Sequence, residues 1–336
     1  MGSLVLVTGA TGFIGRHLCQ RLRSRGMRIR AMLRSMPEGH GGAEPASCWD
    51  EAVQCCLGEE PVPAAAMAGI ETVFHLAGIA HSFEPAKNLE QVYWAVNLEA
   101  TGELLEKARA AGVRRFVYFS SVRAMADPGE RCVDESWEYL PTDIYGLSKR
   151  RAEERVLAAG AAGAMHVCIL RPPLVYGPGV KGNLQRMLRA HAAGRFPPLP
   201  ETGNRRSLVH VDDLAQAAIM AAENEAARGK IYIVTDGRYY STREMYMAMC
   251  EAFGRRIPRW TLPVWALRGL GLAGDALVTV SGRRFPVDSE SVARLLGSAC
   301  YRSEKIQREL GYRPEKDFAG ALPEMVAACR DLARNA

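Results

Sequence analysis

A tyrosine and a lysine four positions apart, Tyr145 and Lys149, have the spacing that places a proton donor beside a positive charge. If residues 145–149 are helical, the two side chains lie one turn apart on the same face. A nearby ammonium stabilises a phenolate and lowers the pKa of the tyrosine, as a general acid or base requires. Ser121 ends the strand expected before this helix, and its hydroxyl could bind the same reacting oxygen. A solvated helix face is the alternative, and the position of Ser121 favours a proton-transfer unit.

The elements that would position these residues begin with a glycine turn. Residues 4–8 are a short apolar run, Gly9-Ala-Thr-Gly12-Phe-Ile-Gly15 follows at once, and residues 16–23 have the spacing of an amphipathic helix. Gly9 would permit the tight turn, Gly12 would let the backbone approach a pyrophosphate, and Gly15 would let helix and strand pack closely. The turn therefore predicts a bound dinucleotide, the alternative being an ordinary glycine-rich loop.

Strands and helices then alternate through the first half of the chain. Strands are expected at residues 28–34, 53–57, 72–76, 115–120 and 166–171, with helices at 89–111 and 145–159 and a surface loop at 35–48. This order predicts an α/β fold with a doubly wound, parallel Rossmann sheet over residues 1–172. From residue 173 the connections become rich in proline, glycine and arginine, so residues 173–336 are expected to form mainly a smaller substrate-binding lobe, with some segments returning to the sheet.

Composition narrows the class of protein. The 336 residues are 48% hydrophobic, and the first apolar run is too short for a cleavable secretory signal, so we expect a cytoplasmic protein. Nine cysteines lack the spacing of a metal site and are expected to be free, buried thiols, with no metal bound. A net charge of +6 suits an anionic small ligand better than nucleic acid.

One apolar stretch, residues 260–280, raises the question of a membrane segment. Arg268 and Asp275 interrupt it and several glycines weaken it as a membrane helix. We therefore expect a helix of the lobe there and no integral membrane segment.

Several motifs together resemble the extended short-chain dehydrogenase/reductases over almost the whole chain. They are the glycine turn, His75-Leu-Ala-Gly78, Asn97, Ser120-Ser121, Tyr145-x-x-x-Lys149 and Arg171-Pro-Pro-Leu-Val-Tyr-Gly-Pro178. The stretches at 175–183 and 204–213 make the sequence similar to the nucleotide-sugar epimerase/dehydratase family, and within it to the UDP-galactose 4-epimerase-like bacterial group that serves polysaccharide biosynthesis.

The resemblance implies a role for individual residues. Tyr145 would be the acid/base, Lys149 would bind the nicotinamide ribose, and Ser121 would orient the substrate hydroxyl. Asn183 and Arg206 would hold the sugar-nucleotide diphosphate, with Arg294 as a further candidate, because a guanidinium pairs with phosphate oxygens. A surface arginine and a helix N-cap are the alternatives for Arg206 and Asn183. The NAD(P) site would comprise Gly9, Thr11, Gly12, Phe13, Ile14, Gly15, Arg34, Leu76, Ala77, Gly78, Asn97, Ser120, Tyr145, Lys149 and Pro172.

Two positions depart from family habits. The second strand ends in Leu33-Arg34-Ser35, where NAD enzymes usually carry an acid for the ribose hydroxyls. An arginine there favours the 2′-phosphate of NADP(H), whereas related epimerases retain NAD. Val122-Arg123 stands where the sugar 4,6-dehydratases carry an Asp-Glu pair, which makes water elimination an unfavoured reaction.

The predicted function is a nucleotide-sugar 4-epimerase acting on a UDP-hexose or UDP-N-acetylhexosamine through a transient 4-keto intermediate. A 4-keto-sugar-nucleotide reductase that consumes NAD(P)H is the alternative. A hydroxysteroid-type dehydrogenase and a non-catalytic dinucleotide sensor are less favoured, because the catalytic residues and the candidate phosphate-binding residues are present. The resemblance also implies a homodimer packed through the helices that carry Asn97 and Tyr145, with Ala152, Val156 and Leu157 as candidate apolar surface.

Overall fold

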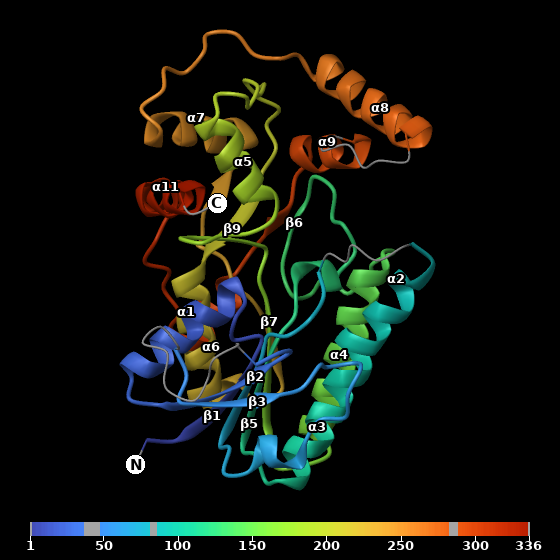
Figure 1. The fold of residues 1–336 in the computed structure, drawn as a ribbon, viewed down its shortest axis with the longest axis vertical. Coiled ribbons are helices and arrows are strands. Elements are labelled where there is room, and N and C mark those ends of the chain that lie inside the picture. The colour runs from blue at the N-terminus through green and yellow to red at the C-terminus, as the bar shows by residue number, and fades with distance from the viewer. Residues whose placement is uncertain (1, 37–47, 81–85, 282–287, 335–336) are drawn as a thin grey trace.

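The computed structural model describes residues 2–36, 48–80, 86–281 and 288–334. Its main element is a seven-stranded sheet in the order β10-β7-β5-β4-β1-β2-β3, and all neighbouring strands in it run parallel. This is the predicted doubly wound sheet, and it lies in the lower half of Figure 1. Its strands are β1 (Leu4–Thr8), β2 (Arg28–Leu33), β3 (Glu51–Gln54), β4 (Thr72–His75), β5 (Arg115–Phe119), β7 (His166–Arg171) and β10 (Lys230–Ile233).

Helices cover both faces of this sheet (Figure 1). Side chains alternate along β1, so that Val5 and Val7 pack with α1 (Phe13–Ser24) and α6 (Val211–Glu223), whereas Leu6 faces the core under α3 (Ala100–Ala110) and α4 (Ile144–Ala161). A π-helical turn (Trp94–Glu99) joins α2 (Ala86–Tyr93) to α3, and short 3₁₀ turns occur at Ala64–Met67, Val122–Ala124 and Glu225–Ala227.

A smaller lobe lies above the sheet (Figure 1). It has its own apolar core and a three-stranded sheet in the order β11-β9-β8. After β9 the chain returns to the large sheet as α6 and β10. The lobe elements are β8 (Leu174–Tyr176), α5 (Asn183–Ala192), β9 (Arg206–His210), β11 (Tyr239–Tyr240), α7 (Thr242–Ala252), α8 (Val264–Ser281), α9 (Ser289–Leu296) and α11 (Phe318–Arg334), with α10 (Glu304–Leu310) beside β10.

A two-stranded sheet links the loop after β5 to the segment after α9. Its strands, β6 (Cys132–Val133) and β12 (Cys300–Tyr301), pair in parallel and place Cys132 opposite Cys300. The two cysteines form a disulfide with their Cα atoms 4.5 Å apart. The expectation that every cysteine is a free thiol was therefore wrong for this pair, because residues 168 positions apart meet only in the folded chain. The free thiols are Cys19, Cys48, Cys55, Cys56, Cys168, Cys250 and Cys329.

Other details also differ from the sequence predictions. The strand expected at residues 53–57 lies at Glu51–Gln54. Ala152 and Val156 are fully buried in the core between α4 and the sheet, so they provide no surface for a second copy. The apolar stretch after Trp260 forms α8, and no helix in the described ranges combines the length and apolar character needed to cross a bilayer.

Candidate active site

The glycine turn joins the carboxyl end of β1 to α1. Gly9 has a φ of 74°, and a Cβ on it would lie 2.9 Å from the backbone nitrogen of Ala77. A Cβ on Gly15 would lie 2.1 Å from the carbonyl oxygen of Gly9, and Gly12 donates a 2.9 Å hydrogen bond to that oxygen. The turn therefore excludes side chains at Gly9 and Gly15. It leads directly into the N-terminus of α1, where backbone amides favour an anion such as a pyrophosphate.

The end of β4 lies beside this turn. The amide of Ala77 donates to the hydroxyl of Thr8 at 3.1 Å, which ties the segment Leu76-Ala77-Gly78 to β1. A Cβ on Gly78 would lie 2.9 Å from the Asn97 Oδ1 atom and 3.0 Å from the Lys149 Nζ atom. Gly78 thus lies directly against two further candidate residues. We call Gly9, Gly15 and Gly78 the glycine cradle. The absence of a Cβ atom at these three residues fits the close approach of a dinucleotide.

Asn97 is buried in the π-helical turn between α2 and α3. Its Oδ1 atom accepts from the amide of Ile79 at 2.9 Å, and its Nδ2 atom donates to the Ile79 carbonyl at 3.1 Å and to the Ser148 hydroxyl at 3.0 Å. Ser148 in turn donates to the carbonyl of Tyr145 at 2.8 Å. Asn97 therefore fixes the end of β4 against the first turn of α4, which carries the tyrosine.

Lys149 is buried on α4. Its Nζ atom donates to the carbonyl oxygen of Phe119 at 3.1 Å and lies 4.8 Å from the centre of the Tyr118 ring. Burial lowers the pKa of Lys149 to about 8, and the charge of Glu153 acts in the opposite direction. Glu153 also accepts two hydrogen bonds from Arg171, 2.8 Å from Nε and 2.5 Å from Nη2. The lysine thus stands next to a buried, paired carboxylate.

Tyr145 lies in the first turn of α4, which Asp143 caps by accepting a 3.0 Å hydrogen bond from the amide of Gly146. Burial raises the pKa of the Tyr145 phenol, whereas a hydrogen bond with Ser121 and the charge of Arg123 lower it. The expected charge effect of Lys149 on this phenol is not the leading one. The lysine ammonium bonds to the Phe119 carbonyl instead, and the guanidinium of Arg123 lies 5.9 Å from the centre of the Tyr145 ring.

Ser120 and Ser121 follow β5 at the same edge of the sheet. Ser121 begins a short 3₁₀ turn, and its Oγ atom accepts a 3.2 Å hydrogen bond from the amide of Arg123. The Oγ atom of Ser120 is buried and has no hydrogen-bond partner within the described ranges. A buried hydroxyl without a partner is unfavourable, so Ser120 fits a ligand atom at this edge. Pro172 follows β7 next to it, and Arg34 is exposed at the end of β2.

The three candidate residues of the lobe differ in environment. Asn183 is exposed at the start of α5, where Gly182 is the N-cap residue. Arg206 is partly buried, and its Nη1 atom donates to the carbonyls of Arg294 and Gly297 at 2.6 and 2.9 Å. The Arg294 side chain is held by Glu290 at 3.4 Å, so Arg294 contributes its carbonyl to this contact.

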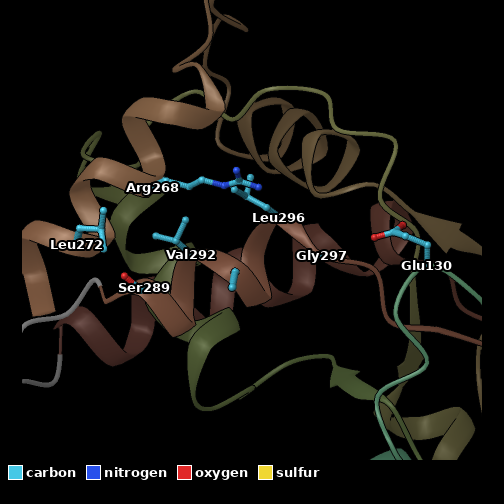
Figure 2. Close-up of a pocket in the computed structure, with 8 residues that line it drawn as sticks. Glu130, Arg268, Leu272, Ser289, Val292, Leu296 and Gly297 are labelled. Atoms are coloured by element: carbon cyan, nitrogen blue, oxygen red, sulfur yellow. The ribbon is translucent and has the colours of Figure 1, made fainter.

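A cavity of about 480 Å³ lies between α8 and α9. Figure 2 shows the side chain of Arg268 on α8 extending toward Leu296 on α9, with Leu272 at the end of the cavity away from Gly297. The cavity also touches Gly297, whose carbonyl accepts from Arg206. It is lined by Glu130, Arg268, Leu272, Ser289, Val292, Ala293, Leu296 and Gly297, and so by none of the predicted catalytic residues.

Two residues of the catalytic region were not predicted from the sequence. Arg123 was noted only for the absence of a dehydratase acid, yet it pairs with Asp143 at 3.1 Å and lies against the Tyr145 ring. Glu153 stands four positions after Lys149, on the same helical face, and this spacing was the signal that could have identified it.

Comparison with known proteins identifies the family of the chain. Residues 5–235 match the model of the NAD dependent epimerase/dehydratase family. The chain is 28% identical to a UDP-glucose 4-epimerase of Vibrio cholerae, over 98% of this chain and 96% of that protein. It is 30% identical to a 3 beta-hydroxysteroid dehydrogenase/Delta 5-->4-isomerase of Mycobacterium tuberculosis, over 95% and 88%. The solved structure of MoeE5 in complex with UDP-glucose and NAD superposes with a TM-score of 0.76 at 25% identity, covering 98% of this chain and 99% of MoeE5.

The family model covers more than half of the chain, and the Vibrio relative matches it over nearly its full length. The parallel sheet covered by helices is the fold of the solved structures that match the chain. The chain therefore belongs to the NAD-dependent epimerase/dehydratase family and is an enzyme of the extended short-chain dehydrogenase/reductase type.

Proposed function

We propose that this enzyme is a nucleotide-sugar 4-epimerase that acts on a UDP-hexose or UDP-N-acetylhexosamine. The observation that carries the proposal is the position of Tyr145 in the first turn of α4, where Ser121 lowers the pKa of its phenol and where Lys149 of the same helix lies against Gly78 of the glycine cradle. A Vibrio relative named UDP-glucose 4-epimerase and the UDP-glucose complex of MoeE5 support the substrate class.

The proposed mechanism assigns a step to each residue. The glycine cradle and Lys149 would hold NAD(P), which when bound would supply hydride transfer from carbon 4 of the sugar and back to the opposite face of that carbon. Tyr145 takes the proton of the 4-hydroxyl group as the carbonyl forms and gives it back when the carbonyl is reduced. Ser121 holds the oxygen in line with the phenol. Lys149 binds the nicotinamide ribose, and its ammonium is kept in place by the carbonyl of Phe119.

The lobe would hold the nucleotide. Arg206 has no carboxylate partner among the described residues, and burial lowers the pKa of its guanidinium. A partly buried cation without an anion is unfavourable, which supports a diphosphate as the missing partner. Asn183 would add a contact from the start of α5. Arg123 in place of an acid supports redox chemistry at carbon 4 without dehydration.

Epimerisation can be tested with the purified enzyme and a UDP-hexose or UDP-N-acetylhexosamine. The expected result is interconversion of the two 4-epimers without net consumption of cofactor. Stoichiometric oxidation of NAD(P)H by a 4-keto sugar nucleotide, with no epimer formed, would replace the proposal with the reductase. Oxidation of a 3β-hydroxysteroid with no turnover of nucleotide sugars would replace it with the activity for which the Mycobacterium relative is named.

The identity of the cofactor separates the same alternatives. Arg34 at the end of β2 supports NADP(H), whereas NAD is the cofactor held by MoeE5. Denaturation of the purified enzyme should release a cofactor whose mass identifies it. Tightly held NAD would support the epimerase, and an empty site with affinity for NADPH would support the reductase.

We also propose a homodimer, on the basis of the family resemblance of the sequence. Because Ala152 and Val156 are buried in the protomer, the contact between the two copies would use other residues of the helices that carry Asn97 and Tyr145. Light scattering of the purified protein measures the mass directly, and a monomer at all accessible concentrations would remove this proposal.

A further inference from the structure

Helix α8 has an apolar face that points away from the protein. The exposed fractions are 77% for Trp265 and 65% for Leu272, and Ala276 continues the same stripe four residues on. The spacing 265, 272, 276 places these residues on one side of the helix. A surface helix normally carries polar side chains on its outward face, so an apolar one is expected to be covered by something.

The opposite face of α8 fixes this orientation. Leu267, Gly271 and Gly274 are buried, and a Cβ on Gly271 would lie 3.0 Å from the Cα atom of Ser289. Helix α8 is therefore packed closely against the start of α9 and cannot turn its apolar stripe inward. In Figure 1 it forms the upper right edge of the lobe, at the end of the loop that runs from α7 across the top.

Exposed arginines accompany the stripe. Arg268 is exposed at the cavity between α8 and α9, and Arg255, Arg256 and Arg259 precede the helix in the loop that also carries Trp260, 62% exposed. Between residues 254 and 274 no acidic residue occurs in the sequence. This surface, which we call the α8 face, thus combines apolar side chains, two exposed tryptophans and positive charge.

We infer that the α8 face docks on the surface of an anionic phospholipid bilayer. Tryptophan side chains favour the boundary between acyl chains and headgroups, and arginines reach anionic headgroups while their stems cover apolar surface. No described helix is long and apolar enough to span a membrane, so the contact is peripheral. A second copy of the chain fits less well, because a twofold contact would bring the arginines of both copies together, and residues 254–274 supply no acid to pair with them.

Vesicle binding of the full-length protein tests this inference. The probes are vesicles of phosphatidylcholine with about a quarter phosphatidylglycerol, and vesicles of phosphatidylcholine alone, in roughly 0.15 M salt. We expect the protein to sediment with the anionic vesicles and its tryptophan emission to shift to shorter wavelength. Replacing both Trp265→Ser and Leu272→Ser should weaken binding about tenfold or more, because binding scales with the apolar area buried.

A second double variant, Arg256→Glu with Arg259→Glu, leaves the apolar stripe intact and should also lose binding, since each arginine near the surface contributes about fivefold. Tyr239→Ser removes an exposed aromatic on β11 and should bind like the wild type. Circular dichroism melting curves establish that the variants are folded. Absence of wild-type binding, or wild-type binding by the serine variant, would overturn the inference. So would a wild-type dimer that does not bind vesicles and that the serine variant converts to monomers.

Discussion

Arg171 in the large sheet and Arg206 in the lobe each stand at one end of a strand, but their positive charges are balanced differently. Arg171 is 1% exposed, and Glu153, equally buried, accepts two of its hydrogen bonds. Arg206 donates to two backbone carbonyls, and no carboxylate pairs with it in the ranges that the structure describes. The carboxylate of Glu153 neutralises the charge of Arg171, whereas the charge of Arg206 is stabilised by the dipoles of two carbonyl groups.

This difference separates structural charges from charges that await a ligand. A buried pair is destabilised strongly when one partner is removed, because the other is left buried and unpaired. A cation held only by carbonyls keeps its ability to bind an anion from solution. The charge of Arg171 is therefore balanced before ligands arrive, whereas the lobe has a charge that substrate would balance.

The largest expected effect comes from breaking the balanced pair. Glu153→Ala should lower the free energy of unfolding by about 3–5 kcal/mol, because it leaves Arg171 as a buried charge. Urea denaturation measures this change. Glu154→Ala is the matched control, since the neighbouring Glu154 pairs on the surface with Arg151 at 2.9 Å and should contribute less than about 1 kcal/mol. Equal effects of the two variants would contradict the structural role of the pair.

The catalytic residue in the sheet half should affect the rate and not the binding of the cofactor. Tyr145→Phe is expected to reduce kcat about a thousandfold, roughly 4 kcal/mol, because it deletes the acid/base and leaves the glycine cradle intact. Tyr93→Phe removes the hydroxyl of a tyrosine whose ring centre lies 5.9 Å from that of Tyr145 and is the matched control. Calorimetric titration with NAD(P) and steady-state kinetics measure the two effects. Loss of cofactor binding in Tyr145→Phe would refute the assigned role.

The sequence could predict the features whose geometry depends on residues close together in the chain. The glycine turn, Ser121 and Tyr145-x-x-x-Lys149 lie at strand ends or within one helix, where local spacing determines geometry. The parallel sheet followed from the alternation of strands and helices. Residue spacing alone was enough to place Tyr145 and Lys149 on α4, but it did not show that the lysine ammonium bonds to the carbonyl of Phe119.

Long-range contacts were beyond the reach of such patterns. The disulfide joins Cys132 to Cys300, and nine cysteines allow many pairings that spacing does not distinguish. Burial of Ala152 and Val156 depends on which side of α4 meets the sheet, and both sides carry apolar residues. The carbonyls around Arg206 come from α9 and the residue after it, about 90 positions later in the chain.

In the lobe the expected effect is on substrate affinity. Arg206→Ala should raise KM for the nucleotide sugar about tenfold to a hundredfold, because a charge-assisted hydrogen bond to a phosphate is lost. The unfolding free energy should change little, in contrast to Glu153→Ala. Arg238→Ala, which breaks an exposed ion pair with Asp317, is the control and should leave KM unchanged. A loss of stability in Arg206→Ala as large as in Glu153→Ala would remove the distinction between the two arginines.

The smallest expected effect concerns Arg123, which is partly exposed in the 3₁₀ turn after β5. Its charge lowers the pKa of the Tyr145 phenol, so Arg123→Gln should raise that pKa. The phenolate accepts the sugar proton, and therefore the acidic limb of kcat/KM against pH should move to higher pH. Solvent screening limits the shift to less than about one pH unit.

Added salt should move the wild-type profile in the same direction, because it screens the interaction between Arg123 and Tyr145. Arg131→Gln is the matched control, since the Arg131 guanidinium lies 4.7 Å from the centre of the Trp137 ring instead. An acidic limb that stays in place, or that moves to lower pH, would show that Arg123 does not act on the phenol. The effect of Lys149 on Tyr145 would then have to be the larger one despite its bond to the Phe119 carbonyl.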